Sequence, residues 1–355
     1  MNPTISIIIP VHHAEETLAG AVQSVGRQDI VRRFPDVRLE LILVDDGTTE
    51  QKALQQAKER CLTALVKILY IQDAGVSESR NRGLQASAGD LITFLDADDA
   101  MEPSMLGDLY ALYLETGAQI CGCGFCSVTP GEAAEYAEAG RRPEDPAACE
   151  SPLPATLLAG SRILQDAVLQ GDTRVWSKLF QRDFIGEKRF QKGLTIGEDL
   201  LFVTSLIRPD TRYALISSPL YRYTRNPKGV MERPFTRSYM DQLRCYEEAE
   251  RVIRSNMPEL LEDAAARRSL RRLQMISDVL TAMKIARLPR EEFQNFRQEF
   301  ARCRRTLAGY SREPGIASVL PGDYRLKSFL LRYLPAAFCI VMRMTAAGKG
   351  TERSA

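Results

Sequence analysis

Three short acidic motifs carry the side chains with which this sequence could do chemistry. Asp45-Asp46-Gly47 and Asp96-Ala97-Asp98 each follow an apolar run, and Gly197-Glu198-Asp199 precedes one. Two carboxylates that lie two residues apart on a turn can bind a hard divalent cation and leave room for phosphate oxygens. A carboxylate at position 198 or 199 can act as a general base that takes a proton from a hydroxyl nucleophile.

Each motif also has a purely structural explanation. An Asp-Gly turn after a strand is common loop chemistry, and acidic residues before a helix often cap it or interact with its dipole. Context favours function at Asp96 and Asp98, because the neighbouring strand also ends in acid and gathered like charges need a cation or polar ligand groups. Only two histidines exist, His12 and His13, so acid–base chemistry must rest on carboxylates.

The first 128 residues alternate short apolar runs with helical patterns. This alternation predicts an α/β fold with a largely parallel, doubly wound sheet, in which ligands bind beyond the carboxyl ends of the strands. We therefore expect Pro10 and His12 to share one crevice with the two aspartate pairs. The expected strands are 4–10, 39–47, 66–72, 90–99 and 118–128, and the expected helices between them include 50–63 and 77–89.

The second half of the chain reads as largely helical. Residues 129–154 indicate a flexible loop or insertion, and residues 156–170 indicate a helix. Beyond residue 236 we expect helices at about 237–255, 259–286 and 290–308. Residues 324–346 mix apolar and basic side chains, which suits equally an amphipathic helix on a membrane surface and a terminal helix docked on the core.

Composition excludes several classes of protein. With 355 residues and 45% hydrophobic residues, the chain can bury the core of one large domain or two modest ones. We expect no transmembrane span, because no apolar run reaches roughly 18 residues, and no secretory signal at the N-terminus. The eight cysteines lack metal or disulfide spacing, which favours the reducing cytosol. The net charge of +1 disfavours nucleic acid as a partner, although residues from 236 onward carry a net +8.

The order of the motifs resembles glycosyltransferase family 2, which comprises inverting enzymes with the nucleotide-binding GT-A fold. The resemblance runs over about residues 3–225 and is greatest to bacterial members that build surface polysaccharides. It implies a GT-A domain over residues 1–230 and a helical C-terminal region over 231–355. The segments that carry it are TISIIIPVHHAEETL, ELILVDDGT, GVSESRNRGLQASAGDLITFLDADD, VWSKLFQRDF and GEDLLF.

The resemblance also implies a role for each matching residue on the donor side. Pro10 and His12 line the nucleotide pocket, Asp45 contacts the base, and Asp46 lies near the ribose. Arg80 lies near the nucleotide, and His13 stands where the family usually has Asn.

The metal and acceptor sides follow from the later motifs. Asp96 and Asp98 match the D-x-D metal pair, with Asp98 the direct ligand. Asp199 matches the catalytic base, and Glu198 supports it. The resemblance implies roles for two further sets of residues: Trp176 and Lys178 shape the acceptor side, and Arg222, Tyr223 and Arg225 belong to a mobile loop near the diphosphate.

We therefore expect a cytoplasmic glycosyltransferase, peripheral on the inner face of the cell membrane if residues 324–346 bind lipid. It would use Mn²⁺ or Mg²⁺ and a nucleotide sugar, with UDP as the expected nucleotide, and a surface glycan or a lipid-linked molecule as acceptor. The alternative is a catalytically inactive nucleotide-binding assembly partner of the same fold, which His13 favours and the intact Asp98 and Asp199 disfavour. A nucleotidyltransferase is disfavoured because residues 10–20 contain only one glycine.

Overall fold

The computed structural model describes residues 2–47, 51–61, 63–139, 155–226, 229 and 233–351. The chain divides into two compact units. The first consists of Met1–Ile163, Thr173–Leu194 and Ser205–Glu232, and the second of Leu164–Asp172, Thr195–Thr204 and Arg233–Ala355. Glu198 and Asp199 therefore belong to the second unit, with the C-terminal helices, and the other predicted site residues belong to the first.

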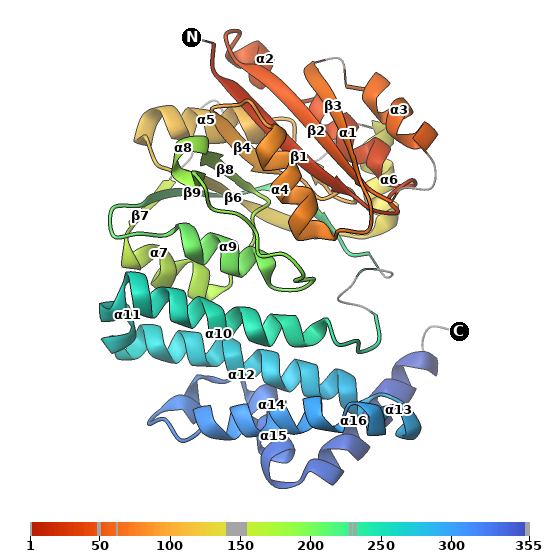
Figure 1. The fold of residues 1–355 in the computed structure, drawn as a ribbon, viewed down its shortest axis with the longest axis vertical. Coiled ribbons are helices and arrows are strands. Elements are labelled where there is room, and N and C mark those ends of the chain that lie inside the picture. Colours follow the sequence, from red (N-terminus) through yellow and green to blue (C-terminus); the bar gives the residue numbers. More distant parts are fainter. Residues whose placement is uncertain are drawn as a thin grey trace. The chain divides into compact units, whose positions relative to one another are not determined.

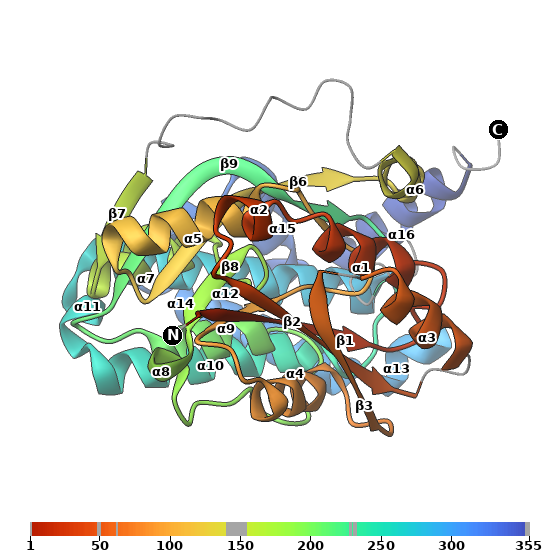
Figure 2. The ribbon, with the colours of Figure 1, turned by 90° about the horizontal axis from the view of Figure 1, so that it is seen from above.

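The first unit is built on a nine-stranded sheet, seen edge-on between helices in Figure 2. The strand order is β3-β2-β1-β4-β8-β6-β9-β5, and β7 pairs with β9. The strands are β1 (Thr4–Val11), β2 (Arg38–Asp46), β3 (Ala64–Ile71), β4 (Leu91–Phe94), β5 (Ala100–Met101), β6 (Ile120–Val128), β7 (Ala155–Ala159), β8 (Lys178–Gln181) and β9 (Arg212–Thr224).

The sheet is parallel in its first half and mixed in its second. Strands β3, β2, β1 and β4 run parallel, as predicted. Strand β8 then pairs antiparallel with both β4 and β6, and β9 is parallel to β6 but antiparallel to β7. The expectation of a largely parallel sheet is thus wrong for the second half. Antiparallel pairs need no crossover helix, so the strand–helix alternation that marks the first half is missing there.

Strand β1 shows how the sequence pattern positions the helices on both faces of the sheet. Ile5, Ile7 and Ile9 point into the same apolar core as Val22 of helix α1 (Leu18–Gly26). Ile8 points to the other face, where helix α4 (Val76–Ala86) packs on β1 and β2 (Figure 2). A Cβ at Gly83 of α4 would lie 2.3 Å from Ile8 Cγ2, so only glycine allows this close approach.

Several predicted boundaries in the first unit need correction. The strand expected at 90–99 ends at Phe94, because the chain turns there into the acidic motif. The helix expected at 156–170 begins instead as strand β7, which pairs with β9 along the sheet edge. The loop expected at 129–154 begins with a helix, and residues 140–154 lie outside the described residues. The remaining helical segments are α2 (Ile30–Arg33), α3 (Gln51–Glu59), α5 (Met105–Thr116), α6 (Pro130–Ala139), α7 (Ser161–Asp166), a 3₁₀ turn (Val168–Gln170), α8 (Arg182–Ile185) and α9 (Glu198–Leu206).

The second unit is helical, as predicted, and α12 packs against both α10 and α14 (Figure 1). The helix expected at 259–286 is interrupted at Asp263, whose carboxylate accepts a hydrogen bond from the Ala266 amide at 2.7 Å and caps α12. The segment 324–346 is likewise two helices, because Pro335 cannot donate within a continuing helix. The helices are α10 (Tyr239–Asn256), α11 (Pro258–Glu262), α12 (Ala264–Ala286), α13 (Arg290–Asn295), α14 (Arg297–Tyr310), α15 (Gly322–Tyr333) and α16 (Pro335–Thr351), with a 3₁₀ turn at Ile316–Val319.

Within the described residues, no helix combines the length and the apolar character that crossing a bilayer requires.

Candidate active site

The end of strand β2 is tied to the start of helix α4 by a buried carboxylate. Asp46 accepts hydrogen bonds from the backbone amides of Ala74 and Gly75, at 2.8 and 2.6 Å. Gly75 adopts φ +83°, a left-handed conformation that favours glycine, and α4 begins at the next residue. Asp46 thus organises the loop that leads to Arg80, and its predicted place beside a ribose stays a prediction.

The end of strand β1 lies beside this loop. Pro10 stands opposite Val44 of β2, and pairing with β4 stops at Ile8, so the missing N–H of Pro10 costs no hydrogen bond on the β4 side. The ring of His12 is exposed, with Nδ1 2.5 Å from the Asp46 carbonyl oxygen. Asp45 is buried at the last position paired with β1. Pro10, His12, Asp45 and Asp46 are therefore brought together at one edge of the sheet.

The acidic turn that follows β4 holds three aspartates, Asp96, Asp98 and Asp99, and is hydrogen-bonded to strand β9. Asp96 and Asp98 are half-buried and Asp99 is buried. Asp99 accepts two hydrogen bonds from strand β9, one from the Tyr221 hydroxyl and one from the Thr224 amide, both at 2.7 Å. Sequence reasoning missed this role of Asp99, which holds the turn against a strand more than 120 residues further along the chain.

Arg80 and Asn226 partner the two predicted metal ligands. The Arg80 guanidinium lies 3.0 Å from one oxygen of Asp96, and the Asn226 amide donates to one oxygen of Asp98 at 3.2 Å. Arg80 is buried and lies over the ring of Phe190, 5.4 Å from its centroid. These contacts leave a second oxygen on each carboxylate, and they place Arg80 beside the D-x-D pair.

The acidic turn concentrates negative charge where water is partly excluded. Burial, followed by repulsion from Asp96, raises the pKa of Asp98. Burial, followed by repulsion from Asp96 and Asp98, raises the pKa of Asp99 well above its usual range. Such a set of carboxylates is stabilised when positive charge arrives.

The donor set of this turn fits a hard divalent cation shared with a phosphate ligand. Among the described residues, no group of three or more His, Cys, Asp or Glu is arranged to hold a metal ion by itself. Mg²⁺ bound with a nucleotide commonly needs only one or two protein carboxylates, because phosphate oxygens and water complete its coordination. Asp96 and Asp98 can supply two such oxygens.

Trp176 is buried in the apolar core of the first unit. Its ring stacks on Tyr221 at 4.5 Å between centroids and on Tyr223 at 5.6 Å. Lys178 is also buried and donates to the Arg174 carbonyl oxygen at 2.8 Å. Their predicted role on the acceptor side stays a prediction, while their observed role is to support strand β9 behind the acidic turn.

The mobile loop predicted around Arg222 and Tyr223 is wrong, because both residues lie within strand β9. The buried Arg222 guanidinium pairs with Glu102 at 2.5 Å and lies over the ring of Tyr136, 4.0 Å from its centroid. Arg225 follows the strand, and its amide bonds to the Val128 carbonyl oxygen. The sequence does not distinguish an arginine that forms a buried ion pair from one that binds phosphate. Only the pairing of strand β9 in the sheet shows that Arg222 forms an ion pair.

The predicted catalytic carboxylates form the first turn of helix α9 in the second unit. Gly197 precedes them with φ +91°, Glu198 is buried, and Asp199 is half-buried. Burial, followed by the negative charge of Glu198, raises the pKa of Cys245 to about 12. The local placement at a helix N-terminus agrees with the sequence prediction, and the catalytic roles of Glu198 and Asp199 stay predictions.

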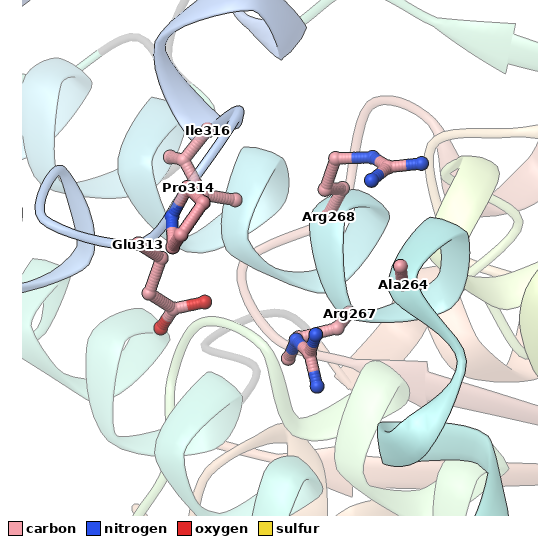
Figure 3. Close-up of a pocket in the computed structure, with 6 residues that line it drawn as sticks. All are labelled: Ala264, Arg267, Arg268, Glu313, Pro314 and Ile316. Atoms are coloured by element: carbon pink, nitrogen blue, oxygen red, sulfur yellow. The ribbon is translucent and has the colours of Figure 1, made fainter.

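Two hollows in the second unit lie apart from every predicted site residue of that unit. One of about 380 Å³ is lined by Arg267 and Arg268 from α12 on one side and by Glu313 on the other (Figure 3). The other, of about 630 Å³, is lined by residues of α10 and α14, including Arg305. The arginines that line the second hollow are mostly paired with carboxylates, for example Arg302 with Glu247 at 3.0 Å.

Comparison with known proteins identifies relatives of this chain. Residues 6–146 match the family model Glycosyl transferase family 2. The uncharacterized glycosyltransferase EpsJ of Bacillus subtilis is 26% identical over 241 residues, which are 66% of this chain and 65% of EpsJ. The chain thus spans just under two thirds of the length of this curated relative.

Solved structures share the fold. Residues 1–349 of Staphylococcus aureus TarS in complex with UDP-GlcNAc align with a TM-score of 0.60 at 16% identity, covering 98% of this chain and 92% of that one. The mannosyltransferase PcManGT from Pyrobaculum calidifontis, in complex with GDP-Man and Mn²⁺, aligns with a TM-score of 0.55 at 14% identity, covering 97% of this chain and 88% of that one. The expected GT-A-like sheet followed by a helical region is therefore confirmed.

Proposed function

Because residues 6–146 match the model of glycosyltransferase family 2, we propose that this chain transfers a sugar from a nucleotide-sugar donor to a hydroxyl group of an acceptor. The observation that carries the proposal is the acidic turn after β4, where Asp96 and Asp98 stand beside the buried Arg80. We further propose UDP as the donor nucleotide. A TarS structure that holds UDP-GlcNAc has the same fold, and this supports the choice.

The donor side of the proposed reaction rests on the first unit. Pro10, His12 and Asp45 would contact the nucleoside, and Asp46 would keep the loop before α4 in place. Asp98, assisted by Asp96, would hold a divalent cation, Mn²⁺ or Mg²⁺, which when bound screens the charge of the leaving diphosphate. Arg80 would hold Asp96 in position for this ligand role. The Mn²⁺ in the PcManGT complex supports a metal of this kind.

The acceptor side rests on helix α9. Asp199 would take the proton of the acceptor hydroxyl while that oxygen attacks the anomeric carbon, and the bond from this carbon to the diphosphate oxygen would break. A single displacement of this kind inverts the anomeric configuration and needs no second nucleophilic carboxylate. Glu198 would support Asp199 from the same helical turn.

We propose a cell-surface glycan or a lipid-linked molecule as the acceptor. TarS, which is named as a poly(ribitol-phosphate) β-N-acetylglucosaminyltransferase, is 25% identical over 63% of this chain and supports an acceptor of the bacterial surface. We propose the cytoplasm as the location of the reaction. The eight cysteines of the sequence lack metal or disulfide spacing, which supports a reducing compartment.

Replacement of the proposed base tests this function. Asp199→Asn is expected to lower sugar transfer by about 10²- to 10⁴-fold, the range for loss of a general base, while UDP binding measured by calorimetry is retained. Asp183→Asn is a matched control, because Asp183 is an exposed aspartate in the first turn of another helix, α8. Unchanged turnover in Asp199→Asn would refute the assignment.

Ligand binding and nucleotide release by the parent protein test whether it is an enzyme or a catalytically inactive nucleotide-binding partner. We expect a panel of nucleotide sugars with Mn²⁺ to raise the unfolding temperature, because a ligand stabilises the state that binds it. The donor that stabilises most should then release its nucleotide on incubation. Binding without any nucleotide release, with or without acceptor, would favour the inactive nucleotide-binding partner.

A further inference from the structure

The C-terminal helices α15 and α16 expose an unusual amount of apolar surface. Thirteen large apolar side chains of the described residues are substantially exposed, and seven of these fall within residues 326–344. We call these seven residues the C-terminal apolar face. They are Leu326, Phe329, Tyr333, Leu334, Ile340, Val341 and Met344.

The spacing of these residues shows that the face is a second apolar side of each helix. On α15, Leu326, Phe329 and Tyr333 recur at intervals of three and four residues, so they share one side. The opposite side supplies Leu331, which is fully buried in the core of the second unit. Helix α16 repeats the arrangement, with Ile340 and Met344 outward and the buried Phe338 inward. The inward residues anchor the helices, so the outward ones are not needed for the core.

Basic side chains border the exposed side. Arg325 and Arg332 are seven residues apart, which is two helical turns, and each directly precedes a residue of the face. The Arg332 guanidinium donates to the Tyr333 hydroxyl at 3.0 Å, so it stays at the edge of the face. Residues 297–345 as a whole carry nine Lys and Arg against three Asp and Glu, a net charge of +6.

We propose that the C-terminal apolar face docks on an anionic membrane surface. Apolar side chains at the boundary between headgroups and acyl chains, with arginines reaching the headgroups, match the physical requirements for an interfacial helix. Charge favours lipid over a second copy of the chain as occupant. A symmetric contact between two copies would bring the same basic segments together, whereas anionic headgroups neutralise them.

This proposal does not depend on sugar transfer, and sedimentation of the full-length protein with vesicles tests it directly. Vesicles that contain phosphatidylglycerol in phosphatidylcholine are expected to bind the protein at least about ten times more strongly than pure phosphatidylcholine vesicles. Phe329→Glu combined with Met344→Glu should reduce binding about tenfold or more, since both side chains are over half exposed and belong to the face.

Controls separate the face from general effects. Leu114→Glu introduces the same charge at a leucine of α5 that is 57% exposed and outside the face, and it should leave vesicle binding unchanged. Arg325→Gln combined with Arg332→Gln should weaken binding to anionic vesicles and reduce its dependence on salt. All variants should keep the unfolding temperature and the nucleotide binding of the parent.

Three results would overturn the proposal. The first is equal binding of the parent protein to neutral and anionic vesicles, and the second is a loss of binding in Leu114→Glu equal to that in the Phe329/Met344 variant. The third is a dimer, detected by light scattering, that dissociates in the Phe329/Met344 variant while vesicle binding is unchanged, because the face would then be a subunit interface.

Discussion

Each of the two units buries an aspartate side chain, but within the described residues only the one in the first unit is hydrogen-bonded. Asp99 of the first unit is 3% exposed, and both of its oxygens accept hydrogen bonds from strand β9. Asp278 of the second unit is 1% exposed, and neither of its oxygens has a hydrogen-bond partner among the described residues. Burial raises the pKa of both carboxyl groups well above the usual range.

The difference indicates which of the two acids is built into a site. The donors around Asp99 fix a turn that also carries Asp96 and Asp98, so the cost of gathering three acids is offset by hydrogen bonds and, in the proposed reaction, by a cation. The negative charge of Glu247 raises the pKa of Asp278 further. The positive charge of Arg302 lowers the pKa of Asp278, but Arg302 is already paired with Glu247. Burial of Asp278 is therefore a net cost to the second unit.

The largest expected effect tests whether the acidic turn serves the reaction. Asp98→Asn should lower sugar transfer by about 10²- to 10³-fold, the range for loss of one group that stabilises developing charge. Mn²⁺ should also strengthen UDP binding much less in this variant than in the parent, as calorimetric titration with and without the ion would measure. Asp36→Asn, at an exposed aspartate of the same unit, is the control. Equal effects of Mn²⁺ in both variants would argue against a metal role for Asp98.

A smaller effect tests the hydrogen bonds that distinguish Asp99 from Asp278. Tyr221→Phe removes the hydroxyl that donates to Asp99 and leaves a buried oxygen without this donor. The free energy of unfolding should fall by about 1–3 kcal/mol, measured by urea denaturation. Tyr70→Phe, at a tyrosine 52% exposed on β3, should change it by less than about 0.5 kcal/mol. If Tyr221→Phe were neutral, Asp99 would resemble Asp278 more than the geometry indicates.

The smallest effect has the opposite sign. Asp278→Leu should raise the free energy of unfolding at pH 7 by about 1 kcal/mol, because an apolar side chain replaces a buried acid without donors, although its larger volume offsets part of the gain. Asp263→Ala, which removes the cap of the same helix, should instead lower it by about 1 kcal/mol. Destabilisation by Asp278→Leu would show that Asp278 has a role that its contacts do not reveal.

The pH dependence of stability provides a second readout of Asp278→Leu. A carboxyl whose pKa is raised in the folded state binds more protons folded than unfolded, so its contribution is full below the unfolded pKa of about 4 and is lost as pH rises through the folded pKa. The difference in stability between Asp278→Leu and the parent should therefore grow with pH over this window. Urea denaturation of both proteins at several pH values would measure it.

Much of the fold could be predicted from local patterns. The apolar runs that became β1, β2 and β3 lie within one or two residues of their expected bounds. Strands β1 and β2 are covered on both faces, which needs a continuous apolar run, and β3 pairs beside β2 at the edge of the sheet. The order of five motifs indicated the resemblance to glycosyltransferase family 2 and the GT-A-like fold. The split of residues 324–346 at Pro335 was also open to prediction, since proline interrupts helical hydrogen bonding.

For the site residues, the sequence indicated their types and spacing but not their burial or their partners. Asp96, Asp98 and Asp99 are chemically alike and adjacent, so their types and spacing indicated an acidic turn but not which acid is buried. Arg222 and Arg80 are both buried arginines, and sequence could not show that the first pairs with Glu102 and the second with Asp96. Asp96 follows strand β4 and Glu102 follows strand β5, so neither partner lies in the same element as its arginine.

The sequence by itself determined the parallel strands of the first half of the sheet, most of the C-terminal helices and the acids at the strand ends, because these depend on periodicity and on residue types within a few positions. Only the tertiary structure decided that Asp99 is held by Tyr221 and Thr224 while Asp278 has no such donor among the described residues. The physical reason is that burial and hydrogen bonding of a side chain depend on which distant segment packs against it. That segment is selected by the folding of the whole unit.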